Sequence, residues 1–265
     1  MTRFPTMFIL NSVAVLCFLY LPVAVLIVLS FNDSQMGVTW QGFSLRWYDK
    51  LFHNPAFLDA MINSLIIALA STGMSLLLGV GTAIGMERLR GRAVSFINMG
   101  LVLPLVIPEI LLGVALLMMF VLIRMPLGFL TIMLGHGVFS LPLTIVIIRA
   151  RLRKLDPTWE DAARDLGADS WRVLTHVTLP LLKPAIVGAA LLAFTVSLDD
   201  FVVTFFVAGP GSTTLPLKVF SMIKTGMTPE INALSALLVL VSILGVGCSW
   251  CYQQRVGRYA EKRLL

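Results

Sequence analysis

Six long apolar segments dominate this chain and restrict it to folds that cross a membrane. A transmembrane helix needs about 20 apolar residues, because each residue adds about 1.5 Å and the hydrocarbon core of a bilayer is about 30 Å thick. The segments of sufficient length are residues 7–30, 61–86, 95–123, 129–149, 185–207 and 231–253. The sequence therefore predicts an all-α, polytopic membrane protein with about six transmembrane helices, in a single transmembrane domain of residues 1–265.

The composition supports this prediction. Of 265 residues, 58% are hydrophobic and only 13% are charged, whereas a soluble domain has about 25% charged residues. The first apolar segment exceeds the roughly 7–15 residues of a signal peptide and carries no small-x-small cleavage site, so we expect it to remain as a helix. Cys17, Cys248 and Cys251 all lie in apolar segments, and we expect them to be small apolar residues of these helices and not a disulfide or metal-binding set. We expect no metal site and no cofactor, and we expect His136 to be a hydrogen-bonded core residue.

The basic residues are distributed unevenly between the segments that connect the apolar stretches. With both termini in the cytoplasm, 15 of the 20 Lys and Arg residues fall on the inner side and five on the outer side. Because Lys and Arg accumulate on the cytoplasmic side of bacterial membrane proteins, this orientation is predicted. It also accounts for the net charge of +6 without a nucleic-acid partner.

The longest inner loop, residues 150–184, has a helical pattern of its own. Asp156 can cap a helix and Pro157 suits its first position, while Gly167 is a suitable residue to end it. A second helical stretch follows over residues 170–177. Taken alone, this pattern predicts an amphipathic surface helix on the inner leaflet.

The same loop resembles the cytoplasmic signature of bacterial ABC importer permeases, the type I, binding-protein-dependent class. That signature reads E-A-A, three residues, G, nine residues, I, one residue, L-P. Here Asp161 replaces Glu and Val177 replaces Ile. The resemblance implies the type I ABC importer permease fold, in which this loop is a coupling helix that docks onto a separate ATPase. The residues expected to couple to the ATPase are Glu160, Asp161, Ala162, Ala163, Gly167, Leu179 and Pro180.

The chain contains no phosphate-binding loop of the kind that ATPases use. Such a loop reads G-x-x-x-x-G-K-[ST], and none of the six lysines follows a glycine. We therefore expect a transport subunit that is not an enzyme, with ATP hydrolysed by partner subunits.

Three acidic residues, Glu109, Asp199 and Asp200, interrupt apolar segments. A charge at the centre of a bilayer costs about 2.5–3.5 kcal/mol on insertion scales, so such residues face a bundle interior or a water-filled cavity. Two interpretations remain open. The acids are structural, which suits Asp200 best, or they bind a cationic substrate, with Ser197 as a hydrogen-bond partner and Trp47 as an aromatic surface for an ammonium group.

A narrower resemblance concerns three stretches: SLDDFVVTFFVAGPG, TTLPLKVFSMIKTGMTPEINAL and NDSQMGVTWQGFSLRWY. They resemble the spermidine/putrescine branch of these permeases. This implies an inner-membrane complex with a second permease subunit, two ATPase subunits, a periplasmic binding protein, membrane lipid and a polyamine substrate. It also implies substrate-binding roles for Asp199, Asp200, Glu109, Ser197 and Trp47.

Two alternatives are kept. The chain is a permease for another ligand, such as ferric iron or an amine-bearing opine, or it is an ion-coupled secondary carrier with the acids as a proton relay. The second alternative leaves the inner-loop motif unexplained.

Overall fold

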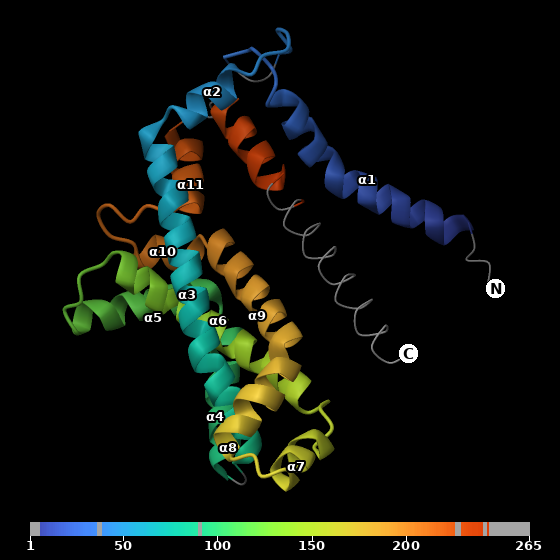
Figure 1. The fold of residues 1–265 in the computed structure, drawn as a ribbon. Coiled ribbons are helices and arrows are strands. Elements are labelled where there is room, and N and C mark those ends of the chain that lie inside the picture. Colours follow the sequence, from blue (N-terminus) through green and yellow to red (C-terminus); the bar gives the residue numbers. More distant parts are fainter. Residues whose placement is uncertain (1–5, 36–38, 90–91, 226–228, 241–242, 244–265) are drawn as a thin grey trace. The chain divides into compact units, whose positions relative to one another are not determined.

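A computed structural model describes residues 6–35, 39–89, 92–225, 229–240 and 243, and the regular elements in these ranges are helices (Figure 1). The chain divides into two compact units. Unit 1 comprises Met1–Leu58 and Val219–Leu265, and unit 2 comprises Asp59–Lys218.

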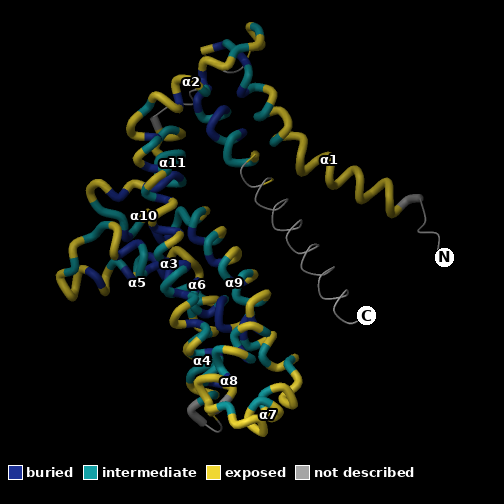
Figure 2. The backbone as a smooth tube through the Cα atoms, in the orientation of Figure 1, coloured by how far each residue is buried: buried dark blue, intermediate teal, exposed yellow. Residues whose placement is uncertain are grey.

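Unit 1 contains α1 (Thr6–Leu29), α2 (Arg46–Phe52), the start of α3 (Pro55–Arg88), the end of α11 (Leu215–Thr225) and an apolar helix at Pro229–Leu240. Figure 2 shows α1 exposed along nearly all of its described length. This exposure suits a helix whose side chains are apolar on every face, because such a helix is stable in lipid.

The segment between α1 and α2 is ordered around one buried side chain, Asn32. Its amide donates to the carbonyl of Thr39 at 2.8 Å and accepts from the N–H of Gln41 at 2.8 Å. Its backbone forms an isolated antiparallel bridge with Phe43. These bonds fix the segment that leads into α2.

Unit 2 holds the remainder of α3, α4 (Arg92–Val106), α5 (Glu109–Leu122), α6 (Phe129–Leu152), α9 (Leu179–Asp199) and α10 (Val202–Val207). Here α6 packs along α9, and α5 packs against α10. One apolar cluster joins α3, α5, α6 and α10 through residues such as Ile67, Phe120, Ile132 and Val203. A second joins α3, α6 and α9 around Met86, Ile148 and Leu182.

The inner loop forms three short elements in unit 2. These are α7 (Thr158–Asp165), α8 (Ser170–Val173) and a π-helical turn, η1 (Leu174–Thr178), that runs directly into α9. The two helical stretches predicted for this loop are therefore present, close to the predicted bounds.

The all-α, multi-pass architecture is confirmed. Within the described ranges, four helices are long and apolar enough to cross a membrane, or five if the bent pair α4–α5 counts as one span. The predicted span at 231–253 begins in the helix Pro229–Leu240. Most of its remainder, with Cys248 and Cys251, lies outside the described residues.

Two predicted continuous helices are broken, and these predictions were wrong in detail. The expected helix at 95–123 bends by 109° between α4 and α5. The cause is Pro108, which has extended backbone angles of φ −56° and ψ 133°. Proline lacks an N–H group and disfavours the helical conformation of the preceding residue, here Ile107.

The second break interrupts the expected helix at 185–207. α9 ends at Asp199, because Asp200 adopts an extended conformation with ψ 120°. α10 then starts at Val202. Both breaks coincide with the acidic residues that the sequence singled out.

Candidate functional site

Each helix break presents one exposed carboxylate. Glu109 is the first residue of α5, and Asp199 is the last residue of α9. The first N–H groups of a helix lack intrahelical acceptors and carry partial positive charge, which stabilises a nearby carboxylate. This placement accounts for an ionisable residue at the start of α5.

Glu109 and Asp199 are both exposed. Neither side chain makes a hydrogen bond or ion pair with another residue in the described part of the chain. Two carboxylates in otherwise apolar spans thus remain available to a ligand. The sequence predicted both as substrate-binding residues, and that role stays a prediction.

Asp200 is placed differently. Its side chain is only 6% exposed, and its Oδ2 lies 3.1 Å from Nε2 of His136. The same oxygen accepts the N–H of Thr204 at 2.8 Å and the Thr204 hydroxyl at 2.9 Å. Asp200 therefore caps the first turn of α10 and pairs with a buried imidazole.

Ser197 belongs to the same buried network. Its hydroxyl lies 2.6 Å from Nδ1 of His136 and 2.9 Å from the hydroxyl of Ser71 on α3. His136 on α6 thereby links α3 and α9 to the start of α10, and its expected role as a hydrogen-bonded core residue is confirmed. Ser71 and Thr204 were not singled out from the sequence. Neither had a local sequence signal, because their roles depend on the packing of α3 and α10 around His136 and Ser197.

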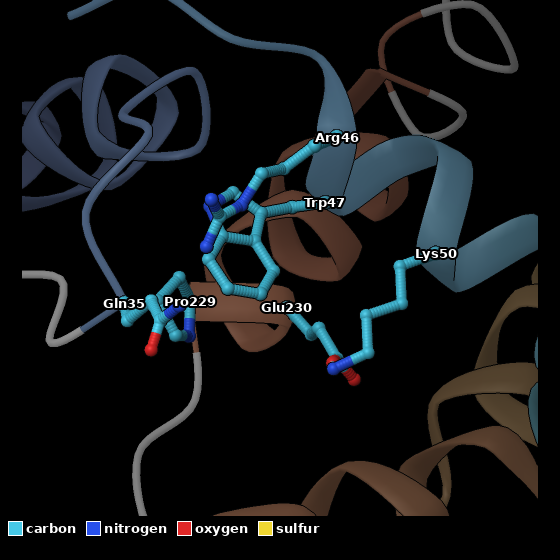
Figure 3. A pocket seen from close by; sticks show the side chains of 6 residues that line it. All are labelled: Gln35, Arg46, Trp47, Lys50, Pro229 and Glu230. Atoms are coloured by element: carbon cyan, nitrogen blue, oxygen red, sulfur yellow. The ribbon is translucent and has the colours of Figure 1, made fainter.

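Trp47 lies in unit 1, so its expected proximity to the acids of unit 2 stays a prediction. It is buried, and its indole N–H donates to the carbonyl of Asn32 at 2.8 Å. The guanidinium of Arg46 lies 4.3 Å from the indole ring centroid, and Nζ of Lys50 lies 5.6 Å from it. A pocket of about 460 Å³ is lined by Arg46, Trp47 and Lys50 together with Gln35, Pro229 and Glu230 (Figure 3).

The residues expected to couple to an ATPase lie around the short helix α7. The carboxylate of Asp156 accepts the N–H of Thr158 at 3.0 Å, and this bond lowers the pKa of Asp156. Within α7, Arg164 pairs with Glu160 and Asp161, each at 3.1 Å. Gly167 ends the helix with φ +85°, a left-handed conformation that glycine adopts without steric cost.

The same segment is tied to the transmembrane region by one bond. Oε1 of Glu160 accepts the hydroxyl of Thr178 at 2.7 Å, one residue before Leu179 and Pro180. Ala162 is exposed and Ala163 is partly buried.

Three large apolar side chains point away from the unit: Trp159, Leu166 and Trp171 are 62%, 90% and 70% exposed. Large apolar side chains exposed on a loop often mark a protein-docking surface.

Spanning helices that are broken at acidic residues, with an exposed helical segment on the longest connecting loop, suit a membrane transport protein. Residues 75–258 match the family described as "Binding-protein-dependent transport system inner membrane component". This chain belongs to that family and is a multi-pass protein of the inner membrane.

Two relatives match most of the chain. It is 40% identical to the spermidine/putrescine transport system permease protein PotC of Escherichia coli strain K12, over 88% of each chain. It is 42% identical to the putrescine transport system permease protein PotI of the same strain, over 94% of this chain and 89% of that protein.

The fold resembles solved ABC transporters. A chain of a bacterial alginate ABC transporter, in complex with an alginate pentasaccharide-bound periplasmic protein, matches with a TM-score of 0.72 at 16% identity. The match covers 95% of this chain and 93% of that chain. A chain of an amino acid ABC transporter with histidines matches with a TM-score of 0.62 at 17% identity, over 79% of this chain and 98% of that chain. The chain therefore has the type I ABC importer permease fold.

Proposed function

We propose that this chain is the permease subunit of an ATP-driven importer that carries polyamines, putrescine or spermidine, into the cytoplasm. The names of the two relatives, at 40% and 42% identity over most of the chain, support this substrate class.

The observation that carries the proposal is the pair of exposed carboxylates at the two helix breaks. Glu109 and Asp199 have no partner in the described part of the chain, and the apolar spans supply no lysine or arginine near them. A polyamine has several ammonium groups separated by methylene units. Its charges can neutralise carboxylates in the membrane, and its methylene units suit the apolar walls between them.

Asp199 and Glu109 would contact the substrate directly, with Trp47 as an aromatic contact for an ammonium group. Asp200 and Ser197 would position Asp199 and not contact the substrate, because their hydrogen bonds to His136 fix the helix break at which Asp199 lies. Transporters of other folds also bind substrate at discontinuous helices in mid-membrane.

Energy would come from separate subunits. The chain has no glycine-lysine pair for a phosphate-binding loop, and α7 with its exposed Trp159, Leu166 and Trp171 offers a surface for an ATPase. We therefore infer a complex with a second permease subunit, two ATPase subunits and a periplasmic binding protein. Both termini of this chain would lie in the cytoplasm.

Uptake of radiolabelled putrescine and spermidine by cells that express the full operon tests the proposal. Native cells should import polyamine, and Asp199→Asn should reduce uptake by about tenfold or more while the complex still assembles, since each lost charge–charge contact is worth about 1.4 kcal/mol or more. Absence of uptake in native cells would exclude polyamines as the substrate. Uptake that is indifferent to Asp199 would place specificity elsewhere.

A further inference from the structure

An ion pair in unit 1 joins α2 to the helix Pro229–Leu240. The ammonium of Lys50 meets the carboxylate of Glu230 (Figure 3). The two partners differ in exposure: the side chain of Glu230 is 10% exposed and that of Lys50 is 64% exposed. The carboxylate of Glu230 is therefore held in a buried position, whereas the ammonium of Lys50 is at the end of a long, flexible and largely exposed side chain.

The indole of Trp47 adds a second attraction for the same ammonium. Nζ of Lys50 lies 5.6 Å from the indole ring centroid, within the range of a cation–π interaction. The indole is held by its own hydrogen bond to Asn32. A carboxylate and a fixed aromatic face beside a pocket of about 460 Å³ are the groups that recognise a primary ammonium.

The other charge in the pocket is already neutralised. The guanidinium of Arg46 pairs with Asp33 at 3.1 Å. Gln35 and Pro229, which complete the lining, carry no charge. Among the described lining residues there is thus one carboxylate, Glu230, for one ammonium, and Lys50 satisfies it.

We infer that Glu230 and Trp47 form an ammonium-binding subsite that Lys50 occupies in the absence of substrate, and that an incoming amine displaces Lys50. A buried carboxylate without a cation is costly, which keeps Lys50 in place. When the ammonium group of an incoming amine replaces that of Lys50, Glu230 is paired again. The displaced Lys50 loses little interaction free energy, because its side chain is already largely exposed to water. The identity of the amine as a polyamine rests on the proposed function. In the proposed orientation the subsite lies on the outer side, where substrate arrives.

Such competition makes a quantitative prediction. The apparent affinity for an amine equals the intrinsic affinity multiplied by the fraction of subsites that Lys50 does not occupy. Removal of the Lys50 ammonium should therefore strengthen binding. In the reconstituted complex with its binding protein, Lys50→Met should lower the apparent KM for putrescine by about three- to tenfold. Lys224→Met is the matched control, because Nζ of Lys224 lies 5.4 Å from the ring of Phe220 and pairs with no carboxylate among the described residues. It should leave KM unchanged.

Glu230→Gln should raise KM, and in the Glu230→Gln background Lys50→Met should have no further effect on KM. A merely structural ion pair would instead make Lys50→Met and Glu230→Gln similar, with less assembled complex and an equal or higher KM. That result would overturn the inference.

A second measurement uses the native chain and needs no transport. Amines that displace Lys50 should raise the acylation of its amino group by a water-soluble ester relative to the acylation of Lys224, measured by mass spectrometry. The ratio to Lys224 is the readout because added amines also consume the ester. Putrescine and methylammonium should both raise this ratio, and 1,4-butanediol should not. A ratio that does not change with either amine would overturn the subsite. If native complexes import no polyamine, the proposed function fails, and the response to methylammonium still decides whether the subsite exists.

Discussion

Nδ1 of His136 lies 2.6 Å from the hydroxyl of Ser197, so an imidazole on α6 is locked to the residue two positions before Asp199. The carboxylate of Asp200 accepts a hydrogen bond from the other ring nitrogen, Nε2. Because a carboxylate can only accept, the proton of a neutral imidazole belongs on Nε2, and Nδ1 then accepts from Ser197. The break between α9 and α10 is thus held from both sides by one side chain.

Loss of His136 should therefore damage folding. His136→Ala leaves the carboxylate of Asp200 without its imidazole donor, and the loss of a hydrogen bond to a buried polar group costs about 1–3 kcal/mol. We expect a lower midpoint of thermal unfolding for the detergent-solubilised complex. His53→Ala, at an exposed residue paired with Asp49, is the control and should shift the midpoint little. An unchanged midpoint in His136→Ala would contradict a structural role for the network.

Asp199 and Asp200 should respond differently to the same substitution, although they are adjacent. Asp199→Asn removes an exposed charge and should lower polyamine uptake per assembled complex, with normal thermal stability. Asp200→Asn removes the charge that accepts the backbone hydrogen bonds at the start of α10 and replaces one of its two accepting oxygens by an NH₂ donor, so it should lower stability, with uptake per assembled complex closer to native. Uptake per complex and unfolding midpoints, measured on the same preparations, separate the two effects. Identical behaviour of the two variants would show that their different environments are irrelevant to transport.

Gly167 should be sensitive to side-chain shape and not to volume. A Cβ atom there would meet no heavy atom within 4 Å, but φ is +85°, where β-branched residues are strained by about 1–2 kcal/mol. Gly167→Val should therefore distort the link between α7 and α8 and uncouple ATP hydrolysis from uptake while membrane insertion continues. Gly167→Asn is the matched control, since asparagine tolerates this conformation. Equal transport by the Val and Asn variants would undermine the docking role of this loop.

Asp156 should stabilise the start of α7 in a pH-dependent way. The N–H of Thr158, donated to its carboxylate, lowers the pKa of Asp156 in the folded protein. A carboxylate whose pKa is lowered by folding stabilises the folded state at pH values above the ordinary aspartate pKa of about 3.9. This stabilisation is lost as the pH falls through the pKa of the folded protein. Hydrogen exchange of α7 in native protein should be slower than in Asp156→Ala near pH 7, and the difference should shrink as the pH falls below the ordinary aspartate pKa. A difference that persists in acid would assign the protection to another contact.

The helices themselves were predictable, because apolar runs of 20 residues or more have few alternatives to a transmembrane helix. The breaks were harder to predict, since apolar residues continue on both sides of Pro108-Glu109 and of Asp199-Asp200. Pro108 before Glu109 was a signal for the first break. Asp200 is paired and Asp199 is exposed because only Asp200 lies within hydrogen-bond distance of His136. That distance is set by the packing of α6 against α10, which the sequence does not reveal. The pairing of Lys50 with Glu230 joins residues far apart in sequence and had no local signature.

The bend at Pro108 also constrains which surface of this chain meets lipid. The carbonyl of Pro108 accepts the N–H of Leu112, so the N–H groups of Glu109, Ile110 and Leu111 have no acceptor within α5. In hydrocarbon each unsatisfied backbone group costs several kcal/mol, and irregular backbone at membrane depth is tolerated only against protein or water. The face that carries this bend must therefore be covered by a neighbouring subunit or line an aqueous passage. Lipid contact is left to the helices with uninterrupted backbones, such as α1.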